Sequence, residues 1–216
     1  MFPVLTPTLP RSVNPEMLCR MDIPHTTTVR NDTGLYNGKL GIWLFIASEA
    51  MLFGGLFSAY VFLRNGVPDW PDAADLLNVP LATINTFVLL TSSVTAAAGW
   101  TALKKGSLRG FRISFLATAL LGLAFLAIKS YEYYEKISTG HYPSTNNFYG
   151  IYFVLTGVHI AHLLGGILVV LYHAGFGARL WDTDPARFTN RIEVTGIYWH
   201  FVDLVWIVLF PMVYLT

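Results

Sequence analysis

Five long apolar segments, separated by short polar stretches, account for most of the chain beyond its first 37 residues. They cover residues 40–63, 81–103, 112–135, 148–171 and 194–215. With a rise of about 1.5 Å per residue, helices of this length cross a hydrocarbon core of about 30 Å. Lipid offers no partner to an open backbone, and the segments lack the two-residue alternation of a membrane barrel. The pattern predicts an all-α integral membrane protein with five transmembrane helices in a bundle.

The third segment is the shortest in strictly apolar residues. Sixteen uncharged residues, 113–128, lie between Arg112 and Lys129. They give only about 24 Å of helix. We therefore expect this helix to continue through Lys129 to Glu135, with the Lys129 side chain extended toward the membrane surface.

Composition agrees with a membrane protein. Charged residues make up 12% of the chain and hydrophobic ones 54%, whereas soluble domains carry about 25% charged residues. The single cysteine, Cys19, excludes an internal disulfide, and the sequence holds neither zinc-site spacing nor a c-type haem attachment motif.

Residues 1–37 contain five prolines and no apolar run. We expect an irregular N-terminal arm on the membrane surface or on a partner, with a disordered tail as the alternative. No signal peptide is expected before the first span.

Basic residues set the expected orientation. Of the 14 Lys and Arg residues, three (Arg64, Lys129 and Lys136) fall on one side of the predicted bundle and the rest on the other. The positive-inside rule then places the N-terminus in the cytoplasm and the C-terminus outside. The acidic loop 65–80 either meets a basic partner such as a cytochrome c or is simply solvated.

Glu49 is the one ionisable residue within the first segment. A carboxylate at that depth is costly unless it faces protein, water or a partner, so Glu49 is a candidate functional residue. The alternative is a protonated glutamic acid that is hydrogen-bonded inside the bundle.

His159 and His162 lie at i and i+3 in the fourth segment, close enough to share a helix face. A bis-histidine haem would need its second ligand from another helix, such as His200, and a redox metal usually has carboxylate or thiolate ligands as well. We favour interhelical hydrogen bonds over a metal site.

Glu193, Gly196, His200 and Asp203 form one polar stripe on the fifth segment. Asp203 lies about 15 Å deeper than Glu193 along the helix, and His200 can pair with it on the adjacent turn. The stripe is either a proton or lipid-headgroup relay or, as we favour, a buried structural pair. Glu49, His159, His162, His200 and Asp203 all fall near the same depth when the helices are laid up and down, which suggests a buried polar layer.

Five motifs resemble subunit III of the haem–copper cytochrome c oxidases, in the family's order and spacing. They are WLFIASEAMLFGGLFSAY, NVPLATINTFVLLTSS, SYEYYEK, GVHIAH and YWHFVDLVWIVLF. The resemblance covers residue 38 to the C-terminus and is to the short five-helix bacterial form, which matches the last five helices of the seven-helix members.

This resemblance implies a non-catalytic subunit of a proton-pumping aerobic terminal oxidase, a cytochrome c oxidase of the aa3 type. Such a subunit binds no haem or copper, which belong to partner subunits. It packs against subunit I, holds structural phospholipid and supports proton uptake and sustained turnover. Subunit II, and further respiratory subunits or a supercomplex, are the other expected partners, and no nucleic acid is. The expected location is the bacterial plasma membrane.

Residue by residue, Glu49 matches the family's buried carboxylate, known for carbodiimide reactivity. The other matches are Glu132 in the EYYE motif, His159 and His162 in the paired-histidine motif, and His200 and Asp203 in WHFVD. Three alternatives remain open: an accessory protein of a nitric oxide reductase, a di-haem membrane cytochrome b, and a secondary transporter. The three histidines lie at about one depth, which argues against a di-haem cytochrome b. No internal repeat is visible, which argues against a secondary transporter.

Overall fold

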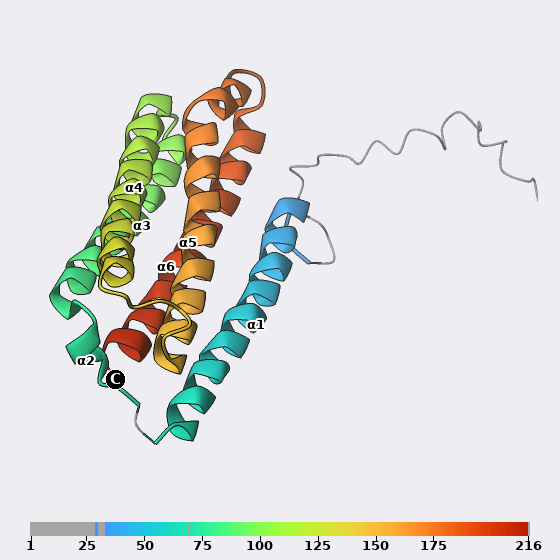
Figure 1. The fold of residues 1–216 in the computed structure, drawn as a ribbon. Helices are drawn as coiled ribbons and strands as arrows, with labels where there is room; N and C mark the ends of the chain where they lie inside the picture. The colour runs from blue at the N-terminus through green and yellow to red at the C-terminus, as the bar shows by residue number, and fades with distance from the viewer. Residues whose placement is uncertain (1–28, 30–32, 69, 216) are drawn as a thin grey trace, which may run out of the picture.

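The structure, a computed structural model, describes residues 29, 33–68 and 70–215, which form an up-and-down bundle of helices (Figure 1). The long helices are α1 (Asn37–Gly66), α3 (Val79–Lys104), α4 (Leu108–Ser138), α5 (Asn147–Ala174) and α6 (Pro185–Tyr214). All five are long and apolar enough to cross a membrane. A short helix, α2 (Ala73–Leu76), precedes α3, and a 3-10 helix, η2 (Phe176–Asp182), precedes α6. The predicted all-α architecture with five candidate spans is confirmed. The expected N-terminal arm lies almost wholly outside the described residues.

The helices start and stop beyond the apolar segments, because polar caps lie outside the hydrophobic runs. At the starts of α4, α5 and α6, a side-chain oxygen accepts a hydrogen bond from a backbone N–H three residues on; the caps are Ser107, Asn146 and Asp184. Proline at the first position also favours the start of α6 at Pro185 rather than at residue 194.

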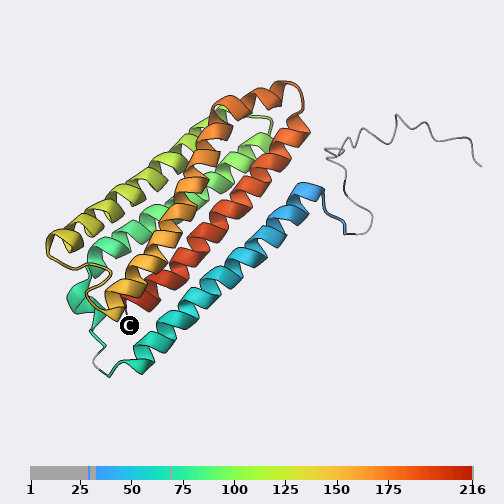
Figure 2. The ribbon, with the colours of Figure 1, turned by 45° about the vertical axis from the view of Figure 1, so that its right-hand side comes forward.

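Helices α3, α4, α5 and α6 form a four-helix body, and α1 lies along one side of it against α5 and α6 (Figures 1 and 2). Helix α1 has just two buried residues, Phe53 and Tyr60. It begins at one end of the bundle and α6 ends at the other. We call these the Asn37 end and the Tyr214 end.

Close helix contacts in the body depend on small residues. A Cβ atom at Gly99 of α3 would lie 2.6 Å from the ring of Phe115 on α4, which is fully buried. Gly122 of α4 and Gly166 of α5 both receive the indole ring of Trp199 from α6. Small residues of this kind let membrane helices approach closely, which is where their packing energy comes from.

Replacing Gly99 by alanine should therefore destabilise the protein. The added methyl group overpacks a contact with a fully buried ring, at a cost of about 1–3 kcal/mol. Gly55→Ala is the matched control, because open space surrounds Gly55 and alanine favours helix. We expect a lower thermal midpoint in detergent for Gly99→Ala and an unchanged or higher one for Gly55→Ala. Equal midpoints for the two variants would contradict the tight contact.

Candidate functional site

Glu49 of α1 contacts His162 of α5. Its Oε2 lies 2.9 Å from Nε2 of His162, and each side chain is 17% exposed. Nδ1 of the same imidazole lies 2.8 Å from the carbonyl oxygen of Val158, so Nδ1 has to be the donor there. One further proton then lies between Nε2 and Oε2, carried by either the imidazole or the carboxyl group. This Glu49–His162 pair joins α1 to the four-helix body and holds one shared proton.

His159 points elsewhere. Its ring is fully buried between Phe125 of α4 and Trp206 of α6, with centroid distances of 5.7 and 5.1 Å. Neither ring nitrogen has a hydrogen-bond partner among the described residues. The interhelical hydrogen bond that we favoured for both histidines is therefore present for His162 and missing for His159 in this part of the chain. The two side chains do not converge on one ligand position.

A buried charge cluster lies toward the Tyr214 end, where α4, α5 and α6 meet. The ammonium group of Lys129 lies 3.1 Å from Glu132 Oε2, and both side chains are 1% exposed. The hydroxyls of Tyr152 and Tyr214 donate to Glu132 Oε1 at 2.8 and 2.6 Å, and Lys129 also contacts the hydroxyl of Tyr214. We call these four residues the Lys129–Glu132 cluster.

The prediction that the Lys129 side chain extends to the membrane surface is wrong, because the side chain is buried in this cluster. The side chain turns inward because a carboxylate one helical turn away and two phenol groups supply partners in the interior. The i, i+3 spacing of Lys129 and Glu132 was a visible signal of the ion pair. No sequence signal linked it to Tyr152 or Tyr214, which come from distant segments.

His200 and Asp203 do not pair, contrary to what their spacing suggested. Nδ1 of His200 lies 2.5 Å from the hydroxyl of Ser93 on α3, and the imidazole is exposed. Asp203 is 3% exposed, and neither of its oxygens accepts a hydrogen bond of ordinary length within the described residues, although Ser93 lies next to it. Residues three apart differ by about 60° around a helix, which here separates an outward side chain from an inward one.

Glu193 lies at the Asn37 end and ties the start of α1 to α6. It accepts from Lys39 Nζ at 2.7 Å and from the Tyr36 hydroxyl at 3.1 Å. Tyr36 also donates to the carbonyl oxygen of Asn190. Burial, and then the negative charge of Glu193, raise the pKa of the Tyr36 phenol, which keeps it protonated and available as a donor.

The candidate residues thus contact partners at several different helix interfaces. The Glu49–His162 pair joins α1 to α5, His200 bonds to α3, Glu132 lies in the cluster with α5 and α6, and Glu193 faces α1. Within the described residues, no three or more His, Cys, Asp or Glu side chains are grouped as metal ligands would be. These contacts stabilise helix packing.

Five apolar spans with polar side chains paired between them define a multi-pass helical membrane protein. The family model for cytochrome c oxidase subunit III matches residues 17–216, and the chain belongs to that family. The resemblance drawn from the five motifs is confirmed.

Relatives support the same assignment over most of the chain. Cytochrome c oxidase subunit 3 of Thermostichus vulcanus is 37% identical over 181 residues, which are 82% of this chain and 86% of the relative. The protein of that name from Corynebacterium diphtheriae is 37% identical over 183 residues, again 82% and 86%. Cytochrome bo(3) ubiquinol oxidase subunit 3 of Pseudomonas aeruginosa is 31% identical over 196 residues, 90% and 91%. The chain is therefore a subunit III of a haem–copper oxidase, and its relatives are subunits of oxidoreductase complexes.

The Lys129–Glu132 cluster yields a prediction about stability. Lys129→Met or Glu132→Gln alone leaves a buried group without its partner, which for a charge costs about 3–5 kcal/mol. The double variant leaves no charge behind, so we expect it to lose less than the sum of the two single variants. The free energy of unfolding, from denaturing-detergent titration of the four proteins, measures the coupling. Strictly additive losses would show that the two charges do not depend on each other.

Proposed function

We propose that this chain is the non-catalytic subunit III of a proton-pumping aerobic cytochrome c oxidase of the aa3 type. There it stabilises the catalytic subunit I, binds phospholipid and supports proton uptake and sustained turnover. The observation that carries the proposal is the subunit III family match, which extends over residues 17–216. The interior contacts agree with a supporting role, because Glu49, His162 and Glu132 are each engaged in joining helices.

In this proposal, the redox groups and the catalytic subunit belong to the rest of the oxidase complex. We propose that haem and copper are held by partner subunits, that subunit I contacts this chain directly, and that subunit II belongs to the same complex. The setting is the bacterial plasma membrane, with the Asn37 end in the cytoplasm. Basic residues support this orientation. Lys104, Lys105 and Arg109 lie at the end of α3, in the α3–α4 connection and at the start of α4, all at the Asn37 end, whereas Arg64 and Lys136 lie at the Tyr214 end.

The proton-linked part of the proposal concerns the Glu49–His162 pair. Glu49 lies about 18 Å along α1 from Asn37, well inside a hydrocarbon core of about 30 Å. A carboxyl group at this depth that shares one proton with a partly exposed imidazole is a local proton store. In our proposal it supports proton supply to subunit I and fixes the position of α1.

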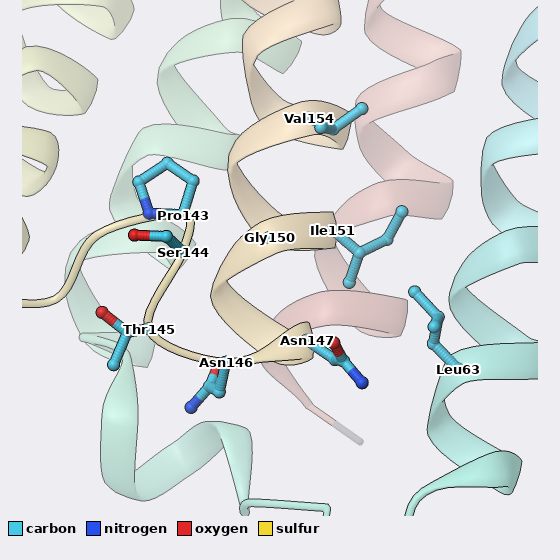
Figure 3. Close-up of a pocket in the computed structure, with 9 residues that line it drawn as sticks. All are labelled: Leu63, Pro143, Ser144, Thr145, Asn146, Asn147, Gly150, Ile151 and Val154. Carbon is cyan, nitrogen blue, oxygen red and sulfur yellow. The ribbon is translucent and has the colours of Figure 1, made fainter.

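The phospholipid assignment rests on a pocket of about 580 Å³ between α1 and α5 at the Tyr214 end. Figure 3 shows Leu63 of α1 pointing toward Ile151 of α5, and the loop before α5, which also lines the pocket, running past the first turns of that helix. Its apolar walls include Leu63, Ile151 and Val154, and its rim is polar, formed by Ser144, Thr145, Asn146 and Asn147. An acyl chain along the walls with its headgroup at the rim matches this division.

Gentle purification of a tagged copy tests the main proposal. In mild detergent, we expect haem absorption to travel with the large oxidase subunits that co-elute with the chain. When this chain alone is stripped away, the haem should stay with the large subunits, which should begin turnover normally and then lose activity faster. Haem retained by the isolated chain would make its histidines ligands and overturn the proposal. Co-elution with a nitric oxide reductase cytochrome would favour the accessory-protein alternative.

The lipid pocket is tested by Val154→Trp, which should fill it. We expect the variant complex to lose at least about one bound phospholipid in native mass spectrometry, because the indole ring occupies the space of an acyl chain. Val169→Trp is the control on the same helix, since Val154 is 47% exposed and Val169 41%. Equal lipid content in the two complexes would show that this pocket is not the site.

A further inference from the structure

The two histidines of α5 differ in how their ring nitrogens are satisfied. Both nitrogens of His162 have partners, whereas neither Nδ1 nor Nε2 of His159 has one among the described residues. The His159 side chain is fully buried. A neutral imidazole still carries one N–H donor and one acceptor nitrogen, and burying such groups without a hydrogen bond is unfavourable. The interior of the four-helix body therefore contains a polar ring whose hydrogen bonds the protein contacts do not supply.

Asn85 of α3 is a second buried side chain with an unsatisfied group. It is 1% exposed, and its Nδ2 donates to the carbonyl oxygen of Phe125 on α4 at 3.4 Å. Its Oδ1 accepts no hydrogen bond within the part of the chain that the structure describes. An amide oxygen has two lone pairs, so Asn85 offers an acceptor to any small donor in the interior.

Asn85 and His159 lie at one level of the bundle. Asn85 bonds to the backbone of Phe125, and the ring of His159 packs on the ring of Phe125 at a centroid distance of 5.7 Å. Trp206 of α6 lies 5.1 Å from the ring of His159 and donates from Nε1 to the hydroxyl of Thr86, the residue after Asn85, at 2.9 Å. Contacts among all four helices thus place the two unsatisfied side chains in the same buried layer.

We propose that a water molecule is bound in this layer and bridges Oδ1 of Asn85 to a ring nitrogen of His159. One O–H of the water donates to Oδ1. The water then either donates its other O–H to the acceptor nitrogen of His159 or accepts from the ring N–H. Buried waters in proteins bond to polar groups of this kind, which lack partners in the protein itself. We call this position the Asn85–His159 water site, and its assignment does not depend on the proposed function.

A metal ion or a lipid suits the position less well. Metal ions in proteins take four or more ligands, and within the described residues no three or more His, Cys, Asp or Glu side chains are grouped as metal ligands would be. An acyl chain offers no hydrogen bond to either Asn85 or His159. Water is small, and it can donate to Asn85 while it donates to or accepts from His159.

The test is a cryo-electron microscopy map of the intact complex that contains this chain, at a resolution that shows ordered waters. We expect a density peak about 2.7–3.2 Å from both Oδ1 of Asn85 and a ring nitrogen of His159. Ser92 and Trp199 are the internal control, because these buried side chains bond directly at 3.0 Å and should show no peak between them. The absence of a peak at the Asn85–His159 site, or a direct bond between the two side chains, would overturn the proposal.

The variant Asn85→Leu tests whether the asparagine holds the water. Leucine has a similar size and offers no acceptor, so we expect the density peak to disappear from the map of the variant complex. A peak that stays in place would show that Asn85 is not one of its partners, which contradicts the bridge.

Stability gives a second readout, through the thermal midpoints of the full-length chain in detergent. With the water bound, Asn85→Leu and His159→Phe each remove one of its partners, and each should lower the midpoint by about 2–4 °C. The double variant should lose less than the sum of the two single losses. Without the water, both groups are already unsatisfied, so each apolar substitution should leave the midpoint unchanged or raise it, and the effects should add. If a variant does not fold, the map of the unsubstituted protein decides the matter.

Discussion

The structure depends on one constraint, which is that a charged or polar side chain inside the membrane is costly unless it has a partner. The Lys129–Glu132 cluster meets it most completely. Two opposite charges that are 1% exposed lie together on α4, and the phenol groups of Tyr152 and Tyr214 reach them from the beginning of α5 and the end of α6. Since all of these groups would be costly to leave unpaired, three of the four helices in the body are fixed relative to one another at the Tyr214 end.

Fewer polar contacts join α1 to the four-helix body, and only two residues of α1 are buried. Lys39 bonds to Glu193 at the Asn37 end, and the Glu49–His162 pair follows near the middle. Toward the Tyr214 end, α1 and α5 border the pocket that includes Leu63 (Figure 3). Polar contacts thus hold the first half of α1, while the second half borders a pocket.

Hydropathy was sufficient to predict the five spans, because length and apolar character alone decide whether a helix can cross a membrane. It could not predict which neighbour each polar side chain meets. The i, i+3 spacing of Lys129 and Glu132 is compatible with their ion pair, but we expected Lys129 at the membrane surface, because Tyr214, which stabilises the burial of the pair, lies in another helix. The expected pairing of His200 with Asp203 failed for a related reason: spacing on one helix gives no information about Ser93 on the next. The five motifs, compared as a set, were sufficient to identify the family, whereas no single residue was.

The polar residues of the spans differ in what they say about function. Those engaged within the chain, such as Glu132 and His162, account for the position of helices and need no further partner to be stable. His200 is different, because its exposed ring satisfies one nitrogen internally and leaves the other to the surroundings. His200 thus has a ring nitrogen that the described residues of this chain do not satisfy, although it lies on a helix apolar enough to span the membrane.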